Sequence, residues 1–259
     1  MKPYFQNERV TLYHGDCFEV MRELQGPFDA AITDPPYGHN NAAGHDLISN
    51  IGRALGAKPN GHSRLPQLRP ILNDGPEATP MFERFCQEAA RLCCCCCCCC
   101  GGGGPDPQFA RWSLILDRYF TFAQQVIWDK GPMGLGWHYR RSYETILVGY
   151  RKGLSKAPWY SSSHRIENII RPGDYGIKKI IPQKNDHPTP KPVELFAHFI
   201  RLHTPDGATI LDPFAGSGTA GVAAMRTGRR AVLIELEEKY CEMAAKRLVA
   251  EFIGKEPLK

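Results

Sequence analysis

The sequence predicts an α/β fold around a mostly parallel, twisted sheet, and three observations lead to this prediction. Short apolar runs bounded by turn residues alternate with segments of helical spacing, a pattern typical of βαβ units. A glycine-rich turn at 215–218 joins one such run to one such helix. The composition, 42% hydrophobic and 23% charged over 259 residues, suits one domain with an insertion or two small domains. It excludes collagen-like, disordered and membrane-spanning chains, because no uncharged run reaches the roughly 18 apolar residues of a spanning helix.

Seven apolar runs are interpreted as strands. Each is short, and Gly, Pro and Asp interrupt the chain at many of their ends. The runs at 122–128 and 145–150 follow one another without a helix between them, so we expect an antiparallel hairpin at the sheet edge. The predicted strands are 10–14, 28–33, 93–100, 122–128, 145–150, 209–211 and 231–234.

Six segments are interpreted as helices. In one of them Phe82, Phe85, Ala89 and Leu92 recur near helical spacing. The predicted helices are 17–24, 81–92, 107–120, 193–203, 219–227 and 239–252. The stretch 38–80 is rich in Gly, Asn, Pro and His and is too long for an ordinary connection, which indicates a functional or disordered loop.

Eight of the 11 cysteines are consecutive, at 93–100. Neighbouring side chains of a strand point to opposite faces, so a continuous run cannot form an orderly disulfide framework. Zinc sites need spaced pairs of cysteines with turns between them, and the sequence has none. We interpret the run as a buried central strand in which Cys acts as a small hydrophobe. Metal binding and an oddity of the gene are the alternatives.

Positive charge is concentrated in one part of the chain. The net charge is +5, and the stretch 129–186 alone carries +6, from eleven Lys or Arg against five Asp or Glu. Seven Trp or Tyr residues are interleaved with these charges, a mixture that suits a polyanion with bases to stack on. A solvated basic surface explains the charge equally well. The candidate contacts with a nucleic acid include Trp137, His138, Arg140 and Arg141.

One motif combines a strand end, a tight glycine turn and a helix start: Asp212-Pro213-Phe214-Ala215-Gly216-Ser217-Gly218-Thr219. Glycine lets the backbone approach a ligand, and a helix N-terminus favours an anion. The motif lacks the Gly-Lys-Ser/Thr of a P-loop and the spacing of the dinucleotide fingerprint. Glu235 ends the next strand, where a carboxylate can accept hydrogen bonds from both ribose hydroxyls. The pair suits a nucleoside that bears a carboxylate, such as S-adenosylmethionine; a turn that serves packing alone is the alternative.

A second motif, Asp34-Pro35-Pro36-Tyr37, follows a buried strand. The exocyclic amino group of a base is a poor nucleophile, because its lone pair is delocalised into the ring. A carboxylate that accepts one N–H and a carbonyl that accepts the other favour the tetrahedral nitrogen that attacks. Prolines hold such a carbonyl in place, and a tyrosine offers a face on which the base stacks.

With these two motifs the chain resembles the amino-methyltransferases that modify DNA bases. The quartet at 34–37 resembles their catalytic motif, and the run at 212–219 resembles their cofactor-binding motif. Here the catalytic motif comes first and the cofactor motif follows 178 residues later. This order is similar to the β class of bacterial and phage DNA methyltransferases, in which the target-recognition region lies between the motifs. RNA N-methyltransferases and protein-glutamine methyltransferases with similar quartets have the opposite order, which argues against both.

The resemblance covers nearly the whole chain and implies a Rossmann-like methyltransferase fold. Asp16-Cys17 matches the position where an Asp accepts a hydrogen bond from the adenine amino group of the cofactor, and 187–192 resembles the segment at its methionine end. The chain departs from the family at Pro190, where Gln is common, and in the Cys run, where the family has an aliphatic strand. No metal ligand is expected. The cofactor-binding residues suggested by the motifs and the resemblance are Asp16, Cys17, Asp34, His187, Thr189, Lys191, Asp212, Phe214, Gly216, Ser217, Gly218, Thr219 and Glu235.

The resemblance implies methyl transfer from S-adenosylmethionine to a base in duplex DNA, with Asp34, Pro35, Pro36 and Tyr37 as catalytic residues. Asp rather than Ser at position 34 favours N6 of adenine, because family members with Ser there mostly modify N4 of cytosine. A cytosine-N4 methyltransferase and an RNA methyltransferase are the alternatives. A DNA- or nucleotide-binding protein without catalysis is a third, and the intact Asp34 and glycine turn argue against it.

The same resemblance divides the chain by role. Residues 1–128 and 187–259 are expected to form the catalytic domain, 38–80 a mobile loop near the target base, and 129–186 the edge hairpin and a small target-recognition insertion. Duplex DNA is the expected partner. A homodimer is left open, because short β-class members often dimerise. The N-terminus lacks the apolar core of a secretory signal, so we expect a cytoplasmic protein without a membrane partner. The resemblance implies a bacterial or phage origin.

Overall fold

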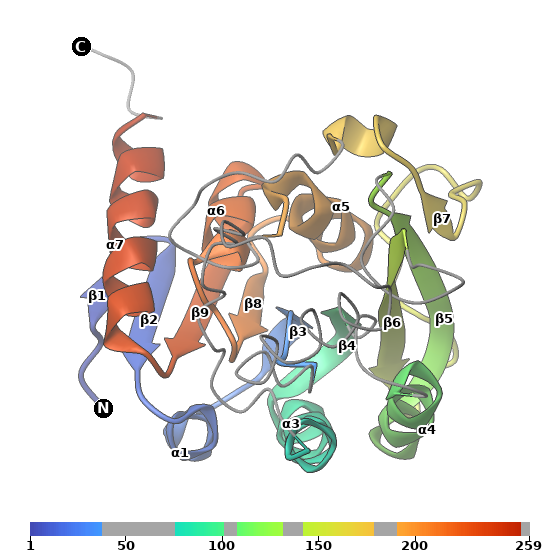
Figure 1. Cartoon of the computed structure of the whole chain (residues 1–259), viewed down its shortest axis with the longest axis horizontal. Helices are drawn as coiled ribbons and strands as arrows, with labels where there is room; N and C mark the ends of the chain where they lie inside the picture. The colour runs from blue at the N-terminus through green and yellow to red at the C-terminus, as the bar shows by residue number, and fades with distance from the viewer. Residues whose placement is uncertain (38–75, 101–107, 132–141, 179–190, 255–259) are drawn as a thin grey trace, which may run out of the picture.

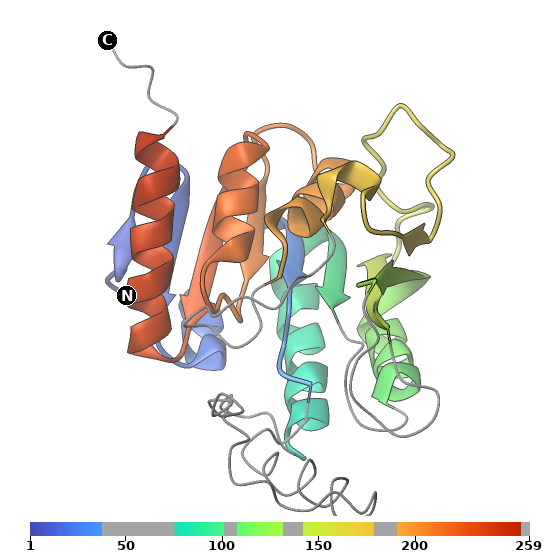
Figure 2. The ribbon, with the colours of Figure 1, turned by 45° about the horizontal axis from the view of Figure 1, so that its top comes forward.

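The computed structural model describes residues 1–37, 76–100, 108–131, 142–178 and 191–254 of the chain, without the side chains of 97–100, 108 and 109. These residues form a central sheet with helices on both faces (Figure 1). Helices α5, α6 and α7 cover one face, and α1, α3 and α4 cover the other (Figures 1 and 2). The α/β prediction is confirmed. No helix within the described ranges has the length and apolar character that crossing a membrane would need.

The sheet has the strand order β1-β2-β9-β8-β3-β4-β6-β5-β7. Five neighbouring strands, β2, β9, β8, β3 and β4, run parallel to one another, and their carboxyl ends lie at one edge of the sheet. The strands are β1 (Phe5–Gln6), β2 (Val10–His14), β3 (Phe28–Thr33), β4 (Cys93–Cys100), β5 (Phe120–Asp129), β6 (Tyr143–Arg151), β7 (Ile169–Ile170), β8 (Thr209–Asp212) and β9 (Arg230–Glu235).

The antiparallel half of the sheet is formed by β5 and β6, as the sequence predicts. β6 pairs antiparallel with both β4 and β5, so this hairpin continues the parallel half. The outermost strand is β7, which the sequence did not predict and which pairs parallel with β5 over two residues. The hairpin therefore lies one short strand away from the edge.

The helices begin and end within a few residues of the predicted bounds. Asp16 shows how one of them starts: its Oδ1 accepts hydrogen bonds from the backbone N–H groups of Phe18 and Glu19, an N-cap of α1. The helices are α1 (Cys17–Glu23), α3 (Ala78–Leu92), α4 (Gln108–Tyr119), α5 (Val193–His203), α6 (Thr219–Arg226) and α7 (Glu238–Ile253), with a 3₁₀ turn at Asp174–Gly176.

The cysteine run forms β4, in the interior of the sheet between β3 and β6, as predicted. Cys93 and Cys96 are buried, and Cys94 and Cys95 are half-buried. The pairing with β3 shifts register here, so that both Cys94 and Cys95 lie opposite Asp29, which is the pattern of a β-bulge. The bulge breaks the alternation of faces that the sequence pattern assumes.

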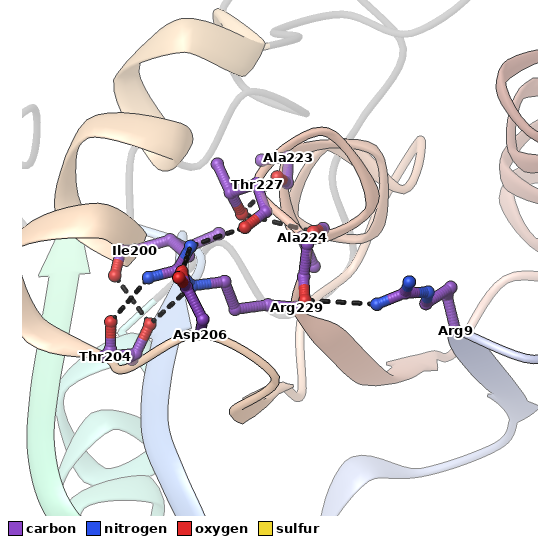
Figure 3. Close-up of polar contacts among 9 residues, drawn as sticks. Arg9, Ile200, Thr204, Asp206, Ala223, Ala224, Thr227 and Arg229 are labelled. Carbon is purple, nitrogen blue, oxygen red and sulfur yellow. Dashed lines mark hydrogen bonds and ion pairs between the residues drawn. The ribbon is translucent and has the colours of Figure 1, made fainter. Parts of the chain in front are cut away.

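A buried arginine joins two helix ends at the amino-terminal edge of the parallel strands. The Arg229 guanidinium donates to the backbone carbonyls of Thr227 (2.5 Å) and Thr204 (2.7 Å), which follow α6 and α5 (Figure 3). It also pairs with Asp206 at 2.6 Å. A cation is favourable there, because the last carbonyls of a helix carry partial negative charge. This edge of the sheet is thus held together opposite the edge where the motifs lie.

Candidate active site

The two sequence motifs meet at the carboxyl edge of the parallel strands. Asp34 directly follows β3, and Asp212 ends the neighbouring β8. Glu235 ends β9 opposite His14 of β2, and Asp16 lies two residues beyond that pairing. In open α/β sheets this edge is where ligands bind. The structure therefore brings together residues from both ends of the chain that the sequence assigned to one site.

The Asp34 carboxylate is held on both of its oxygens. Oδ1 accepts a short hydrogen bond from the Tyr37 hydroxyl, and Oδ2 accepts one from Lys191 Nζ at 2.7 Å. The side chain is 20% exposed, so part of the carboxylate remains accessible. Burial raises the pKa of Asp34 above its ordinary value, and the Lys191 ammonium opposes this rise. Geometry of this kind fixes the direction in which the carboxylate can accept a further N–H.

Tyr37 is buried among aromatic and charged groups. Its ring meets Trp112 edge to face, with centroids 6.3 Å apart, and Lys191 Nζ lies 5.0 Å from its centroid. Trp112 in turn stacks on Phe82 with centroids 4.0 Å apart. The quartet is therefore supported from α3 and α4 through these rings.

Two charged residues that the sequence analysis missed lie beside the quartet. Glu144 Oε2 is 3.3 Å from Lys191 Nζ, and Glu144 Oε1 accepts from Lys130 Nζ at 3.0 Å. Burial alone would raise the pKa of Glu144, but Lys191 and Lys130 hold it below its ordinary value. The only sequence signal was a charged residue just outside each arm of the predicted hairpin, Lys130 after 122–128 and Glu144 before 145–150, and pairing of the arms was needed to bring them together.

Asp212 is buried beneath the glycine turn. Its Oδ1 accepts from Thr33 Oγ1 at 2.5 Å and from the backbone N–H of Phe214 at 3.1 Å. Burial raises its pKa to about 7, and the negative charges of Asp34 and Glu235 add to that rise. The carboxyl is thus poised between its neutral and charged forms near neutral pH.

Glu235 is fixed by backbone donors. Its Oε2 accepts from Gly216 N–H at 2.7 Å and its Oε1 from Glu237 N–H at 2.8 Å. Burial raises the pKa of Glu235, and these two hydrogen bonds oppose the rise. A carboxylate oxygen has more than one lone pair, so each oxygen can still accept from a hydroxyl group.

The glycine turn needs glycine at Gly218. Its φ of +78° lies in the left-handed region, and an added Cβ would come within 3.0 Å of Ala244 Cβ. The hydroxyls of Ser217 and Thr219 face α7, where Arg247 Nη1 donates to them at 3.1 and 3.0 Å. Arg247 of α7 therefore engages both of these hydroxyls.

The remaining predicted site residues have different surroundings. Asp16 uses Oδ1 for the helix cap, and Oδ2 receives no hydrogen bond from the described residues. Cys17 follows it and is half-buried, with a pKa raised to about 12 by burial. Phe214 packs edge to face on Phe85, with centroids 5.8 Å apart. His187 and Thr189 lie outside the described residues, as do Trp137, His138, Arg140, Arg141 and most of the predicted loop 38–80.

The donor set at the strand edge fits a nucleoside with an aminoacyl end. It offers the carboxylate of Asp16 just after β2, that of Glu235 at the end of the neighbouring β9, the Asp212 carboxyl, whose pKa is raised to about 7, and a glycine turn that permits close approach. Among the described residues, the group of Asp, Glu, His and Cys side chains close enough to share a metal is Asp29, Cys94 and Cys95, at the β-bulge.

Comparison with known proteins decides the family. Residues 28–246 match the family described as DNA methylase, N6_N4_Mtase. The chain belongs to this family. It is therefore a DNA methyltransferase, and S-adenosylmethionine is its methyl donor.

Several relatives and solved structures are similar to this chain over most of their length. The type II methyltransferase M2.DpnII of Streptococcus pneumoniae is 28% identical, over 96% of this chain and 93% of that protein. TTHA0409 of Thermus thermophilus, a putative DNA modification methylase solved with S-adenosyl-L-methionine, has a TM-score of 0.62 at 23% identity, covering 95% of this chain and 97% of that one. The cytosine-N4-specific PvuII DNA methyltransferase has a TM-score of 0.65 at 15% identity, covering 97% and 94%. The predicted Rossmann-like methyltransferase fold is confirmed; the β class stays a prediction.

Proposed function

We propose that the enzyme transfers a methyl group to N6 of adenine in duplex DNA. The observation that carries the proposal is the Asp34 carboxylate, which is held at the end of β3 next to the glycine turn after β8. Asp at this position favours adenine by the resemblance described above. Cytosine N4 is the second candidate, because the PvuII DNA methyltransferase, which shares the fold, is cytosine-N4-specific.

The cofactor would lie along the carboxyl ends of β2, β9 and β8. Asp16 Oδ2 would accept from the adenine amino group, and the Glu235 carboxylate would accept from the ribose hydroxyls. The backbone of 216–218 would approach the aminoacyl end, and ionised Asp212 would balance its ammonium charge. Bound S-adenosylmethionine supplies a methyl carbon on a sulfonium, which is reactive toward a nucleophile in line with the C–S bond.

The quartet would bind the amino group of the target base. Asp34 would accept one N–H, and the backbone carbonyl beside Pro35 and Pro36 would accept the other, which favours a tetrahedral nitrogen. An ionised Asp34 accepts a stronger hydrogen bond than a neutral carboxyl group does, and the ammonium of Lys191 favours this ionised state. A strong base is not needed, because the amino proton becomes acidic once the nitrogen gains the methyl group.

The target base must leave the duplex to reach Asp34. Base extrusion costs a few kcal/mol, which contacts elsewhere on the DNA offset. We propose that 129–186 supplies recognition contacts and that 38–80 lies near the extruded base. Because the similar type II methyltransferase M2.DpnII is from the bacterium Streptococcus pneumoniae and this chain belongs to a family of DNA methylases, we propose a cytoplasmic location. A measurement of mass in solution tests for a homodimer.

The decisive experiment compares Asp34→Ala with the parent enzyme. Tritiated S-adenosylmethionine is supplied with DNA, RNA or free nucleosides, and the products are digested and separated. We expect N6-methyladenine in DNA from the parent and a loss of several orders of magnitude in Asp34→Ala. Isothermal titration should show cofactor affinity within a few-fold of the parent, because Asp16, Glu235 and the glycine turn are unchanged.

The control is Asp206→Ala, which removes an exposed carboxylate at the opposite edge of the sheet. It should methylate DNA normally. N4-methylcytosine in the digest would select the second candidate. An equal loss of cofactor affinity in Asp34→Ala would show that Asp34 belongs to the cofactor site instead.

A further inference from the structure

Four charged side chains of alternating sign form a row that ends at the catalytic quartet. Lys130 Nζ lies 3.0 Å from Glu144 Oε1, Glu144 Oε2 lies 3.3 Å from Lys191 Nζ, and Lys191 Nζ lies 2.7 Å from Asp34 Oδ2. Lys191, Glu144 and Asp34 are 7%, 12% and 20% exposed, so water screens these pairs less than surface pairs. The two positive and two negative charges balance. We call these four side chains the charged row, 130–144–191–34.

The row is built by secondary structure from four separate segments. Lys130 follows β5, and its backbone N–H donates to the Ser142 carbonyl at 2.8 Å, which closes the end of the β5–β6 hairpin. Glu144 lies in β6, and Lys191 lies just before α5. The row therefore connects the antiparallel half of the sheet to the catalytic strand β3.

The charge of Asp34 depends on the groups that face it. Burial raises its pKa, the Lys191 ammonium and the Tyr37 hydroxyl lower it, and the negative charge of Glu144 raises it. Asp212 also interacts electrostatically with Asp34 across the β3–β8 pair. Losing Lys191 would therefore leave a buried carboxylate without its nearest cation, which favours the neutral acid.

We propose that Lys191 is a positioning residue for Asp34, and that Glu144, held by Lys130, fixes Lys191 in that place. Lys191 binds Oδ2 and keeps Asp34 ionised and oriented, so that the carboxylate accepts the N–H of the target amino group. The inference rests on the proposed function of Asp34. It assigns Lys191 to the catalytic carboxylate rather than to the methionine end of the cofactor, where the sequence resemblance had placed it.

The first test measures the ionisation of Asp34 without DNA. Carboxyl ¹³C signals of labelled aspartate are followed by NMR across pH, and Asp34→Asn identifies the signal. Lys191→Met removes a cation and should raise the apparent pKa of Asp34. Glu144→Gln removes an anion but keeps an amide oxygen that accepts from Lys191, so it should lower the apparent pKa of Asp34. Glu167→Gln, an exposed carboxylate paired with Arg171, should leave the titration unchanged.

The second test measures single-turnover methylation of duplex DNA across pH. Lys191→Met should lose at least about tenfold in rate near neutral pH, and its acidic limb should move to higher pH. The acidic limb of Glu144→Gln should move the opposite way. Lys191→Arg, which keeps the cation, should restore part of the rate and the parent position of the limb. Substitutions that only weaken the fold would not move the two limbs in opposite directions.

The outcomes separate the inference from the function on which it rests. If the apparent pKa of Asp34 shifts in opposite directions in the two variants but the parent enzyme methylates no DNA, the inference about Lys191 and Glu144 stands and the proposed function is rejected. The inference would be overturned if DNA methylation were normal and the apparent pKa of Asp34 either did not change or moved in the same direction in Lys191→Met and Glu144→Gln. Circular dichroism checks the fold of each variant, and if Lys191→Met does not fold, Lys191→Arg and Glu144→Gln carry the test.

Discussion

Asp212 shows how one residue can be structural and titratable at once. It is buried at the end of β8, where Thr33 and the backbone of Phe214 satisfy only one of its oxygens by hydrogen bonds that the described residues supply. Its pKa, raised by burial to about 7, means that the folded protein without ligand holds a proton that the unfolded chain releases near its ordinary value of 3.8. An ammonium group beside it would reverse this preference.

The pH dependence of folding follows from this proton. Between about pH 4 and about pH 7 the folded state binds more protons at Asp212 than the unfolded state does, so the Asp212 contribution to stability falls as pH rises. Asp212→Asn keeps an acceptor for Thr33 and the backbone but does not ionise. Relative to the parent, we expect the variant to gain on the order of 2–3 kcal/mol in free energy of unfolding between about pH 5 and about pH 8.

Urea unfolding without cofactor at the two pH values measures this difference. Asp206→Asn, at an exposed aspartate, is the control and should differ from the parent by the same amount at both. A pH-independent difference for Asp212→Asn would show that Asp212 is already ionised in the folded protein.

The site residues that could be predicted from the sequence are those whose role follows from their own side chain and from their place at a strand end. Asp34, Asp212 and Glu235 each lie at or directly after an apolar strand, and their assembly follows from the parallel order of those strands. Lys130 and Glu144 gain their role only from the pairing of β5 with β6, which places Trp128 opposite Glu144. No local pattern carries that register, so the sequence analysis could not find them.

The elements are joined at their ends as well as along their faces. Arg229 satisfies carbonyls that follow both α5 and α6, whereas Arg9 donates to the nearby Gly228 carbonyl at 3.1 Å from an exposed position. Both arginines are drawn in Figure 3. Both donate to backbone carbonyls, but Arg229 is buried and Arg9 is exposed, so a comparison of the two measures the effect of burial.

Arg229→Met should destabilise the fold by about 2–4 kcal/mol, because it leaves buried carbonyls without their charged donor. Arg9→Met should change stability by less than about 0.5 kcal/mol. Thermal and urea unfolding measure both. Each variant should methylate DNA normally per folded molecule, since the catalytic quartet lies at the other edge of the sheet. Equal losses would mean that burial of the Arg229 contacts does not matter.

The cysteine strand should tolerate other small side chains. We expect Cys93→Val and Cys96→Val, which fill buried positions, combined with Cys94→Ser and Cys95→Ser at the half-buried bulge, to give a folded and active enzyme. The repacking should cost no more than about 3 kcal/mol. Circular dichroism, unfolding and methyl transfer test this, and elemental analysis tests for metal in the parent. Stoichiometric metal with activity lost to a chelator would contradict the structural role of the run.

The longer helices and strands could be predicted from the sequence, but the two-residue strands and the β-bulge could not. All seven predicted strands and six predicted helices are present, because each had a period and a boundary residue in the sequence. The two-residue strands β1 and β7 are too short to show a period, and tertiary pairing alone creates them. The bulge at Cys94 and Cys95 is likewise invisible in a run of identical residues.

The whole molecule is expected to meet DNA through its basic stretch, 129–186. In the described part of this stretch, Trp159, Tyr160 and Tyr175 are exposed, as side chains that contact a nucleic acid would be. Several charged side chains of this stretch, including Lys130 and Arg171, already form ion pairs within the protein. Positive charge for contact with DNA would therefore come from the remaining Lys and Arg residues of the stretch.

Salt dependence of binding tests this surface. Each phosphate contact releases counterions, so the logarithm of affinity should fall linearly with the logarithm of salt, by about 0.9 per contact. Replacing Lys178 and Lys179 with Ala should weaken binding to every sequence and reduce the slope by up to about 2. Replacing Arg140 or Arg141 should instead cost about 1–3 kcal/mol on the cognate site alone if that side chain reads a guanine edge. Unchanged slopes and affinities on cognate and scrambled duplexes would place recognition in 38–80.

The order of strands in the sheet also sets the order in which a working enzyme can appear. Val10 of β2 pairs with Ala231 of β9, so β2 leaves the ribosome long before the strand that pairs with it. Contacts between such distant segments slow folding, because a long loop must close before they form. A nascent chain that stops before β8 lacks the glycine turn and the strand beside β2. Methylation would thus begin only after synthesis of β9, and a nascent chain without this strand would not modify DNA.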